Sequence, residues 1–290
     1  MEVLFDSLEL SEEILKAVTE MGFTKPSPIQ AEAIPPLLEG RDVLGQAQTG
    51  TGKTAAFGIP ALEQVDISDK RTQVLMLCPT RELAVQVTEE LRRIAKYKKG
   101  LKVETVYGGD SIERQIRSLK IGAQIVVGTP GRVMDLIERK ALKLDFVNYV
   151  VLDEADEMLD MGFREDIETI LESVPEERQT VLFSATMSKP IMSIAQKFQE
   201  EPVQIKITRK EVTNENIEQT YFEVKQRAKT EVTCRLLDAY DLKQVIIFCN
   251  TKRKVDEVTE ELSAKGYSVE SLHGDLRQTQ RNQVMAKFRS

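Results

Sequence analysis

Short apolar runs alternate with longer amphipathic segments over the first two thirds of the chain. Continuous apolar runs indicate strands that are buried on both faces, which is typical of a parallel sheet. Alternation of such strands with helices predicts an α/β fold with a doubly wound parallel sheet. The runs read RDVLGQA, QVLMLC, KVETVYG, AQIVVG, NYVVLD and QTVLFS, and they end near residues 47, 78, 108, 128, 153 and 184.

The pattern breaks at residues 207–218, which read ITRKEVTNENIE and are polar without periodicity. We expect a linker there, after a first domain over residues 1–206. A second α/β pattern follows over residues 219–290, with strands at QTYFEV, QVIIFCN and YSVESLHG and helices over about 227–240 and after Thr251. This is about half a domain, so we expect the chain to end inside its second domain and to expose apolar surface or self-associate.

Composition narrows the class of protein. The chain is 41% hydrophobic and 30% charged, which is ordinary for a soluble globular protein. Its net charge of -7 argues against whole-protein attraction to nucleic acid, so phosphate binding needs a local basic face. The three cysteines lack metal-ligand spacing, and no apolar stretch approaches the roughly 20 residues of a membrane helix. The start is acidic and amphipathic, unlike a secretory signal, and we expect a cytoplasmic protein without a membrane partner.

Residues 47–54 read AQTGTGKT and lie between a predicted strand and a helical run, the context of a phosphate-binding loop. Gly50 and Gly52 permit backbone angles that let successive N–H groups converge on phosphate. Lys53 would bind the terminal phosphates and Thr54 would bind Mg²⁺. The alternative is a glycine-rich turn that only happens to contain GKT. The expected nucleotide-binding residues of this loop are Thr49, Gly50, Thr51, Gly52, Lys53 and Thr54.

Asp153 and Glu154 follow the buried run NYVVL, which places them at the carboxyl edge of the sheet, where α/β folds bind ligands. Asp153 is suited to hold Mg²⁺, and Glu154 to orient and deprotonate an attacking water. The alternative is a helix N-terminus that favours acidic residues through its dipole.

With these motifs in order, the chain resembles DEAD-box RNA helicases of the short bacterial, cold-shock type, from Phe5 to its end. The resemblance implies two RecA-like domains facing a cleft, with ATP and Mg²⁺ between them and RNA across both. It rests on GFTKPSPIQ at 22–30, AQTGTGKT at 47–54, PTRELA at 79–84, GG at 108–109, TPGR at 129–132, DEAD at 153–156, SAT at 184–186, VIIFCNT at 245–251 and HGDLRQTQR at 273–281.

The resemblance assigns adenine recognition to the segment 5–30. Gln30 matches the glutamine that reads the adenine edge, and a side-chain amide can pair with N6 and N7 at once. Phe5 and Phe23 match aromatics around the base, and Lys25 matches a backbone contact to it. Ser27 to Gln30 also has the sequence of a capping box, with serine as N-cap, proline next and glutamine at the third helical position.

The resemblance also implies RNA contacts and a coupling segment. The RNA segments each follow an apolar strand, so they share one sheet edge near helix N-termini that bind phosphate. Ser184 and Thr186 match hydroxyls that link the acidic pair to domain closure, although SAT also reads as an N-cap before a helix. The alternative for each arginine is a solvated or salt-bridged side chain. The expected RNA contacts are Thr80, Arg81, Gly109, Thr129, Arg132, Gln278 and Arg281.

The implied activity is ATP-dependent, local and non-processive unwinding of short RNA duplexes with little base specificity. Alternatives are an ATP-gated RNA clamp that assembles ribonucleoproteins and a DNA motor with the same core. RNA-degradation or ribosome-assembly proteins are possible partners. The family's arginine-finger motifs, which supply about 10³–10⁵ in rate, follow HGDLRQTQR in relatives and are absent from these 290 residues. We therefore expect nucleotide binding with poor turnover.

Overall fold

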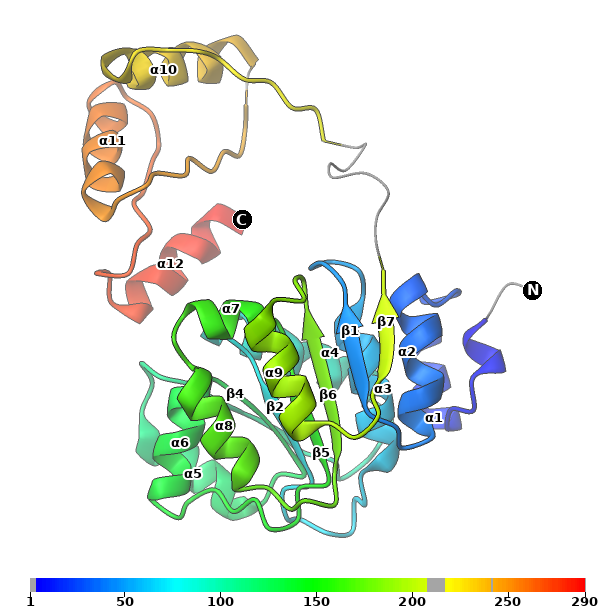
Figure 1. Ribbon diagram of the computed structural model, residues 1–290. Helices are drawn as coiled ribbons and strands as arrows, with labels where there is room; N and C mark the ends of the chain where they lie inside the picture. The colour runs from blue at the N-terminus through cyan, green and yellow to red at the C-terminus, as the bar shows by residue number, and fades with distance from the viewer. Residues whose placement is uncertain (1–3, 208–216, 241, 290) are drawn as a thin grey trace. The chain divides into compact units, whose positions relative to one another are not determined.

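The computed structural model describes residues 4–207, 217–240 and 242–289, and the chain forms two compact units, Met1–Lys210 and Glu211–Ser290. Most of the linker expected over residues 207–218 lies outside the described residues. Each unit has its own elements, which Figure 1 labels.

The first unit is built on a seven-stranded sheet in the order β3-β4-β2-β5-β6-β1-β7 (Figure 1). Every neighbouring pair is parallel, with Val43 of β1 opposite Val181 of β6, for example. The predicted doubly wound parallel sheet is therefore confirmed. The strands are β1 (Val43–Gln46), β2 (Val74–Leu77), β3 (Val103–Val106), β4 (Ile125–Gly128), β5 (Tyr149–Leu152), β6 (Gln179–Ser184) and β7 (Val203–Lys206).

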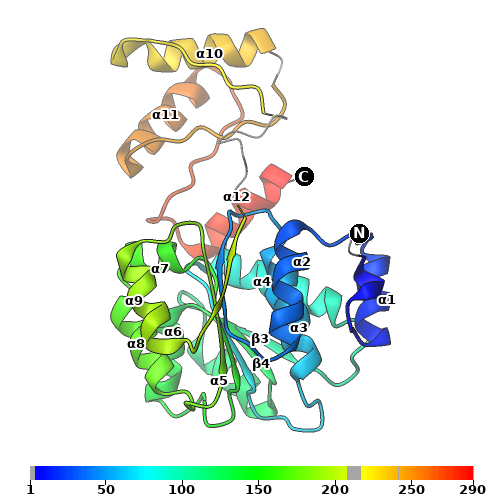
Figure 2. The same ribbon diagram turned by 45° about the vertical axis from the view of Figure 1, so that its right-hand side comes forward.

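Helices cover both faces of this sheet, as Figure 2 shows. One face packs against α1 (Glu12–Glu20), α2 (Pro28–Leu38), α3 (Lys53–Gln64) and α4 (Arg81–Ile94). The other packs against α5 (Ile112–Ile121), α6 (Pro130–Glu138), α7 (Ala155–Asp160), α8 (Arg164–Glu172) and α9 (Lys189–Phe198). A short helix, η1 (Phe5–Ser7), precedes α1. None of the helices in the described ranges is long and apolar enough to cross a bilayer.

Strand β7 is an element that the sequence reading missed. It pairs with β1, placing Val203 opposite Val43, and within it only Ile205 is fully buried. An edge strand has one face in contact with the core, so its sequence VQIK alternates instead of forming a continuous apolar run. A pattern of continuous apolar runs therefore does not predict β7.

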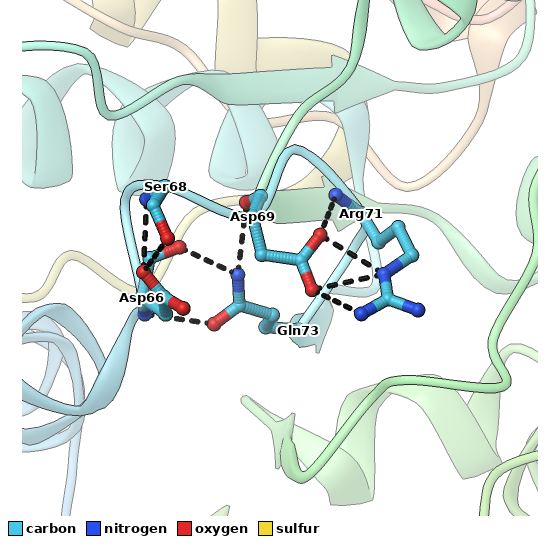
Figure 3. Close-up of polar contacts among 5 residues, drawn as sticks. All are labelled: Asp66, Ser68, Asp69, Arg71 and Gln73. Carbon is cyan, nitrogen blue, oxygen red and sulfur yellow. Dashed lines mark hydrogen bonds and ion pairs between the residues drawn. The ribbon is translucent and has the colours of Figure 1, made fainter.

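The loop before β2 is held by its own polar side chains, at the edge of the sheet where the strands begin (Figure 3). Buried Gln73 accepts the Asp66 N–H at 2.8 Å and donates to the carbonyls of Asp66 and Asp69 at 2.8 and 3.1 Å. Asp69 in turn accepts the Arg71 backbone N–H and guanidinium at 2.9 Å. These bonds hold the loop between α3 and β2 in place. The loop lies at the edge of the sheet opposite to the loops that follow the strands.

The second unit contains the helices expected for it but not the strands. It has η2 (Gln226–Ala228), α10 (Lys229–Tyr240), α11 (Lys252–Ala264) and α12 (Gln278–Arg289). No strand pairing occurs among its described residues, so the strands predicted at QTYFEV, QVIIFCN and YSVESLHG are wrong for this structure. A β-prone sequence becomes a strand only when its N–H and C=O groups find a neighbouring ladder.

The unpaired segment at 245–249 is apolar and open to solvent. Ile246 is 61% exposed and Phe248 is 92% exposed. The segment has the apolar sequence of a buried central strand, but no neighbouring strand or helix among the described residues buries it. The expected exposure of apolar surface in this part of the chain is confirmed.

Candidate functional site

The order of the strands sorts the sequence motifs into two groups on one sheet edge. Because all strands are parallel, the segments that follow them lie at the same edge. The neighbours β5, β6 and β1 lead to DEAD, SAT and the glycine-rich loop. The neighbours β3, β4 and β2 lead to GG, TPGR and PTRELA.

The glycine-rich loop has the backbone that its sequence predicts. Gly50 and Gly52 have φ of +75° and +91°, in the left-handed region that favours glycine, and α3 begins at Lys53. A Cβ added at Gly52 would lie 2.5 Å from Nε2 of Gln30. Gly52 therefore serves both the turn and the close approach of the Gln30 segment.

Lys53 joins the loop to the acidic pair. Its Nζ lies 2.7 Å from Oε1 of Glu154 and 3.8 Å from Oδ1 of Asp153, and it donates to the Ala47 carbonyl at 3.2 Å. The lysine side chain is only 5% exposed, so these charges interact with little screening by water. The two motifs that the sequence separates by about a hundred positions thus meet in one site.

Asp153 is buried in an environment that disfavours its charge. Burial raises its pKa to about 6, against the attraction of Lys53 and together with repulsion from Glu154. Its Oδ1 has no hydrogen-bond partner among the described residues. An unpaired carboxylate oxygen and the hydroxyl of Thr54 are hard oxygen donors, so this donor set fits Mg²⁺.

Glu154 has a left-handed backbone, with φ 52° and ψ 50°, at the position that precedes α7. A residue other than glycine loses about 1 kcal/mol or more in this conformation. The strained residue is the one whose carboxylate bonds Lys53. Backbone strain of this kind is typical of functional sites, where the direction of a side chain matters more than local stability.

Thr54 has a partner that sequence reasoning did not identify. Its side chain hydrogen-bonds to the half-buried carboxylate of Glu90 on α4, and burial raises the pKa of Glu90. Helices α3 and α4 approach closely there, because a Cβ at Gly58 would lie 2.6 Å from Leu91. Nothing in the run RELAVQVTEEL distinguishes Glu90 from its acidic neighbours, so only the packing of the two helices reveals it.

Of the two roles that the sequence left open for Gln30, the structure shows the capping box. Its Oε1 accepts the Ser27 N–H at 2.9 Å, as in a capping box, and its Nε2 donates to the Gly52 carbonyl at 3.1 Å. Ser27 Oγ also donates to the Thr51 carbonyl at 2.7 Å. A side-chain amide has two N–H donors and two lone pairs, so these contacts leave capacity for an adenine edge.

The two aromatics of the same segment lie together. The rings of Phe5 and Phe23 stack at 6.1 Å and 25°, with Phe5 buried and Phe23 half-buried. Lys25 is exposed. Of the two rings, only Phe23 is therefore partly accessible to a ligand.

Ser184 and Thr186 contact the last acidic residue of DEAD. The backbone N–H groups of Ala185 and Thr186 donate to Asp156 at 3.4 and 3.0 Å, and Ser184 Oγ donates to the Thr186 carbonyl at 2.6 Å. The N-cap reading of SAT is wrong, because α9 begins after Ser188. Asp156, which sequence reasoning left without a role, is what ties this segment to α7.

The segments after β2, β3 and β4 form a second group of contacts. Thr80 caps α4 by accepting the Leu83 N–H at 3.2 Å, and the Arg81 guanidinium lies 4.4 Å from the Tyr107 ring centre. Arg132 is only 11% exposed. Of the alternatives for Arg132, a solvated side chain is therefore wrong, whereas a salt bridge is present, with Nε 3.9 Å from Asp135. Thr129 stands at the N-cap position of α6 without a side-chain cap bond.

Two family models match the chain by sequence. The model described as DEAD/DEAH box helicase matches residues 27–194, more than half of the chain, and the Helicase conserved C-terminal domain matches residues 228–290. The chain belongs to the DEAD/DEAH box helicase family. The resemblance inferred from the motifs is therefore confirmed.

Curated relatives of this DEAD-box chain include the DEAD-box ATP-dependent RNA helicase CshA of Bacillus cereus, which is 54% identical over 98% of the chain and 54% of the relative. CshA of Streptococcus pneumoniae is 52% identical over 99% of the chain and 54% of the relative. The chain thus spans about half the length of these curated relatives.

Solved structures agree on the fold. A DEAD box protein from Methanococcus jannaschii is 43% identical, with a TM-score of 0.69 over 100% of this chain and 78% of that one. Dbp5 of S. cerevisiae, bound to RNA and ADP BeF3, is 36% identical, with a TM-score of 0.88 over 99% of this chain and 73% of that one.

The remaining predicted RNA residues of the DEAD-box chain lie in the second unit. Gln278 begins α12, and Arg281 Nη1 donates to Gln278 Oε1 at 3.2 Å, so the two residues share one helical turn. The only histidine of the sequence, His273, hydrogen-bonds to Asp256 at 3.0 Å.

Proposed function

We propose that this chain carries the nucleotide- and RNA-binding core of an ATP-dependent RNA helicase that locally unwinds short duplexes. One observation carries the proposal: the Nζ of Lys53, in the phosphate-binding loop, lies 2.7 Å from Glu154. In this proposal, Lys53 would bind phosphate beside a carboxylate that would act on water. The curated relatives are named as ATP-dependent RNA helicases, which supports this assignment.

The mechanism follows from a change of partner at Lys53. Phosphate oxygens of ATP compete with Glu154 for its ammonium group, and the displaced carboxylate is then able to orient a water for attack on the terminal phosphate. Thr54 and Asp153 would hold Mg²⁺, which neutralises charge that develops on the phosphates. Gln30 would pair with the adenine edge while it keeps its bonds to Ser27 and Gly52.

RNA would bind along the edge after β2, β4 and β3, mainly through its phosphates and 2′-hydroxyls and with little base specificity. Gln278 and Arg281 of the second unit would add contacts. The protein would act in the cytoplasm, with RNA-degradation or ribosome-assembly proteins as candidate partners.

Substitution of the loop lysine tests the site. Lys53→Ala removes the only cation that the structure places against Glu154 among the described residues, so nucleotide affinity measured by calorimetry should fall at least about tenfold. Lys98→Ala is the matched control, because the Lys98 side chain is also largely covered, at 11% exposed, and pairs with Glu63 at 2.8 Å, but in another part of the unit. Equal nucleotide affinity for wild type and Lys53→Ala would contradict the assignment.

A further inference from the structure

The turn at residues 107–110, between β3 and α5, is open on its outer side. Gly109 has φ of +81°, and a Cβ built at Gly108 or Gly109 would meet no described atom within 4 Å. In the described part of the chain, the N–H groups of these two glycines donate no backbone hydrogen bond. Both glycines are exposed, so the turn leaves two N–H groups accessible that have no protein acceptor among the described residues.

Gln115 of α5 holds one end of this turn. Its side chain is buried at 3% exposure, and its Nε2 donates to the Tyr107 carbonyl at 3.1 Å. Its Oε1 is also buried and has no hydrogen-bond partner in the described ranges. Burying an unpaired acceptor is unfavourable, so the single bond to Tyr107 is made at some cost to stability.

Arg132 of α6 holds the other end. Its Nη1 and Nη2 both donate to the Asp110 carbonyl at 3.2 Å. The Asp110 carboxylate accepts the Ser111 N–H at 2.8 Å and also pairs with Arg114. The carbonyls on both sides of the two glycines are thus held by side chains from two different helices.

We infer that Gln115 and Arg132 are positioning residues that hold the turn 107–110 so that the N–H groups of Gly108 and Gly109 stay available to an RNA phosphate. The inference rests on the proposed binding of RNA. Backbone N–H groups are common phosphate donors, and a turn that is already ordered loses less conformational entropy when it binds. Gln115 would act on RNA only through the turn, since its amide is buried.

Gln115→Met is the direct test, because methionine keeps the length of the side chain and removes its donor. The substitution also removes the unpaired Oε1, so the fold should keep its stability. Loss of one bond that orders the turn should weaken binding of a short fluorescein-labelled oligouridylate about fivefold, measured by anisotropy. Nucleotide affinity should stay unchanged. Gln115→Asn, whose amide is too short to reach Tyr107, should behave in the same way if the methionine variant folds poorly.

Gln199→Met is the matched control. Gln199 also has a buried, unpaired Oε1 and donates from Nε2 to backbone carbonyls, Val43 at 2.9 Å and Thr180 at 2.8 Å. It lies where β1 and β6 begin, at the edge opposite the turn. The control should bind RNA as the wild type does, which separates a general effect of losing a buried amide from an effect on the turn.

Amide hydrogen exchange shows whether the effect of the substitution is confined to the turn or spread over the fold. Amides of residues 107–111 should exchange faster in Gln115→Met and at the wild-type rate in Gln199→Met. Wild-type RNA affinity in both Gln115 variants would overturn the inference and leave RNA binding intact. A wild-type chain that does not bind the oligouridylate would overturn the proposed function and the inference with it.

Discussion

At the scale of single residues, the site keeps groups that folding alone would not favour. Asp153 is an acid buried without a hydrogen-bond partner for Oδ1, and Glu154 has a strained left-handed backbone. Both lie against Lys53, whose charge compensates them only in part. Such unfavourable features usually mark groups that a ligand completes.

Asp153→Asn should stabilise the unliganded protein at neutral pH. The pKa of Asp153 in the folded state is about 6, above its ordinary value of 3.8, so its stabilising contribution is fully present below that ordinary value and is lost as the pH rises through about 6. Near neutral pH the buried charge then costs about 1–3 kcal/mol, which asparagine avoids.

The stability difference between Asp153→Asn and the wild type is measured by thermal unfolding near pH 7 and near pH 5, about one unit on either side of the pKa of Asp153. The midpoint of Asp153→Asn should exceed that of the wild type at the higher pH, and the gap should narrow at the lower pH, where the wild-type carboxyl is largely protonated. A variant less stable than the wild type at neutral pH would contradict the pKa shift and its cause.

At the scale of elements, what the sequence predicted depended on burial. Five of the predicted strands are buried and appear as apolar runs, whereas the edge strand β3, VETV, is half-buried at its centre. The ends of the predicted strands place Thr80, Gly109, Thr129 and Asp153 at one edge of the sheet. The edge strand β7 alternates and was missed. The strands expected in the second unit did not form, because local sequence cannot supply a neighbour to pair with.

The site residues also divide into those that the sequence predicted and those that only the packing reveals. The positions of Lys53 and the acidic pair followed from motif and strand order, since the acidic pair directly follows β5 and Lys53 begins the helix after the loop that follows β1. Glu90, Asp156 and Gln115 act through partners brought close by packing between elements, as in the bond from Gln115 to Tyr107. Asp156 belongs to the DEAD motif, although the motif alone gave it no role. Glu90 and Gln115 have no spacing that separates them from ordinary polar residues of a helix.

Gln73→Ala should lower the free energy of unfolding by about 2–3 kcal/mol, because three hydrogen bonds of a buried amide are lost and the Asp66 N–H is left without its acceptor. Urea denaturation measures this change. Ser68→Ala, in the same loop but at an exposed bond to Asp66, should change stability by less than about 0.5 kcal/mol. Because the loop lies at the opposite sheet edge, a large loss of nucleotide affinity in the Gln73 variant would be unexpected.

At the scale of the whole molecule, the two units differ in how well their apolar residues are covered. The first has two continuous cores on the faces of its sheet, whereas the second exposes Ile246 and Phe248. An exposed β-prone segment with unpaired backbone groups is a template for association. The chain should therefore self-associate through residues 245–249.

Phe248→Ser should reduce that self-association, since it removes the most exposed of these large side chains. Sedimentation velocity over a range of protein concentrations measures the effect, and nucleotide affinity serves as the check that the first unit is intact. An identical distribution of species for wild type and variant would show that association, if present, uses another surface.

Backbone hydrogen bonds also run across the edge where the strands of the first unit end. Asp153 N–H donates to Leu77 at 3.0 Å, Cys78 to Gly128 at 2.9 Å, and Thr129 to Val106 at 3.1 Å. Asp153, Glu154 and the turn 107–110 thus follow strands whose ends are hydrogen-bonded to their neighbours. Because each strand end is bonded to the next, a displacement at the strand that carries Asp153 would be passed to its neighbours through these bonds.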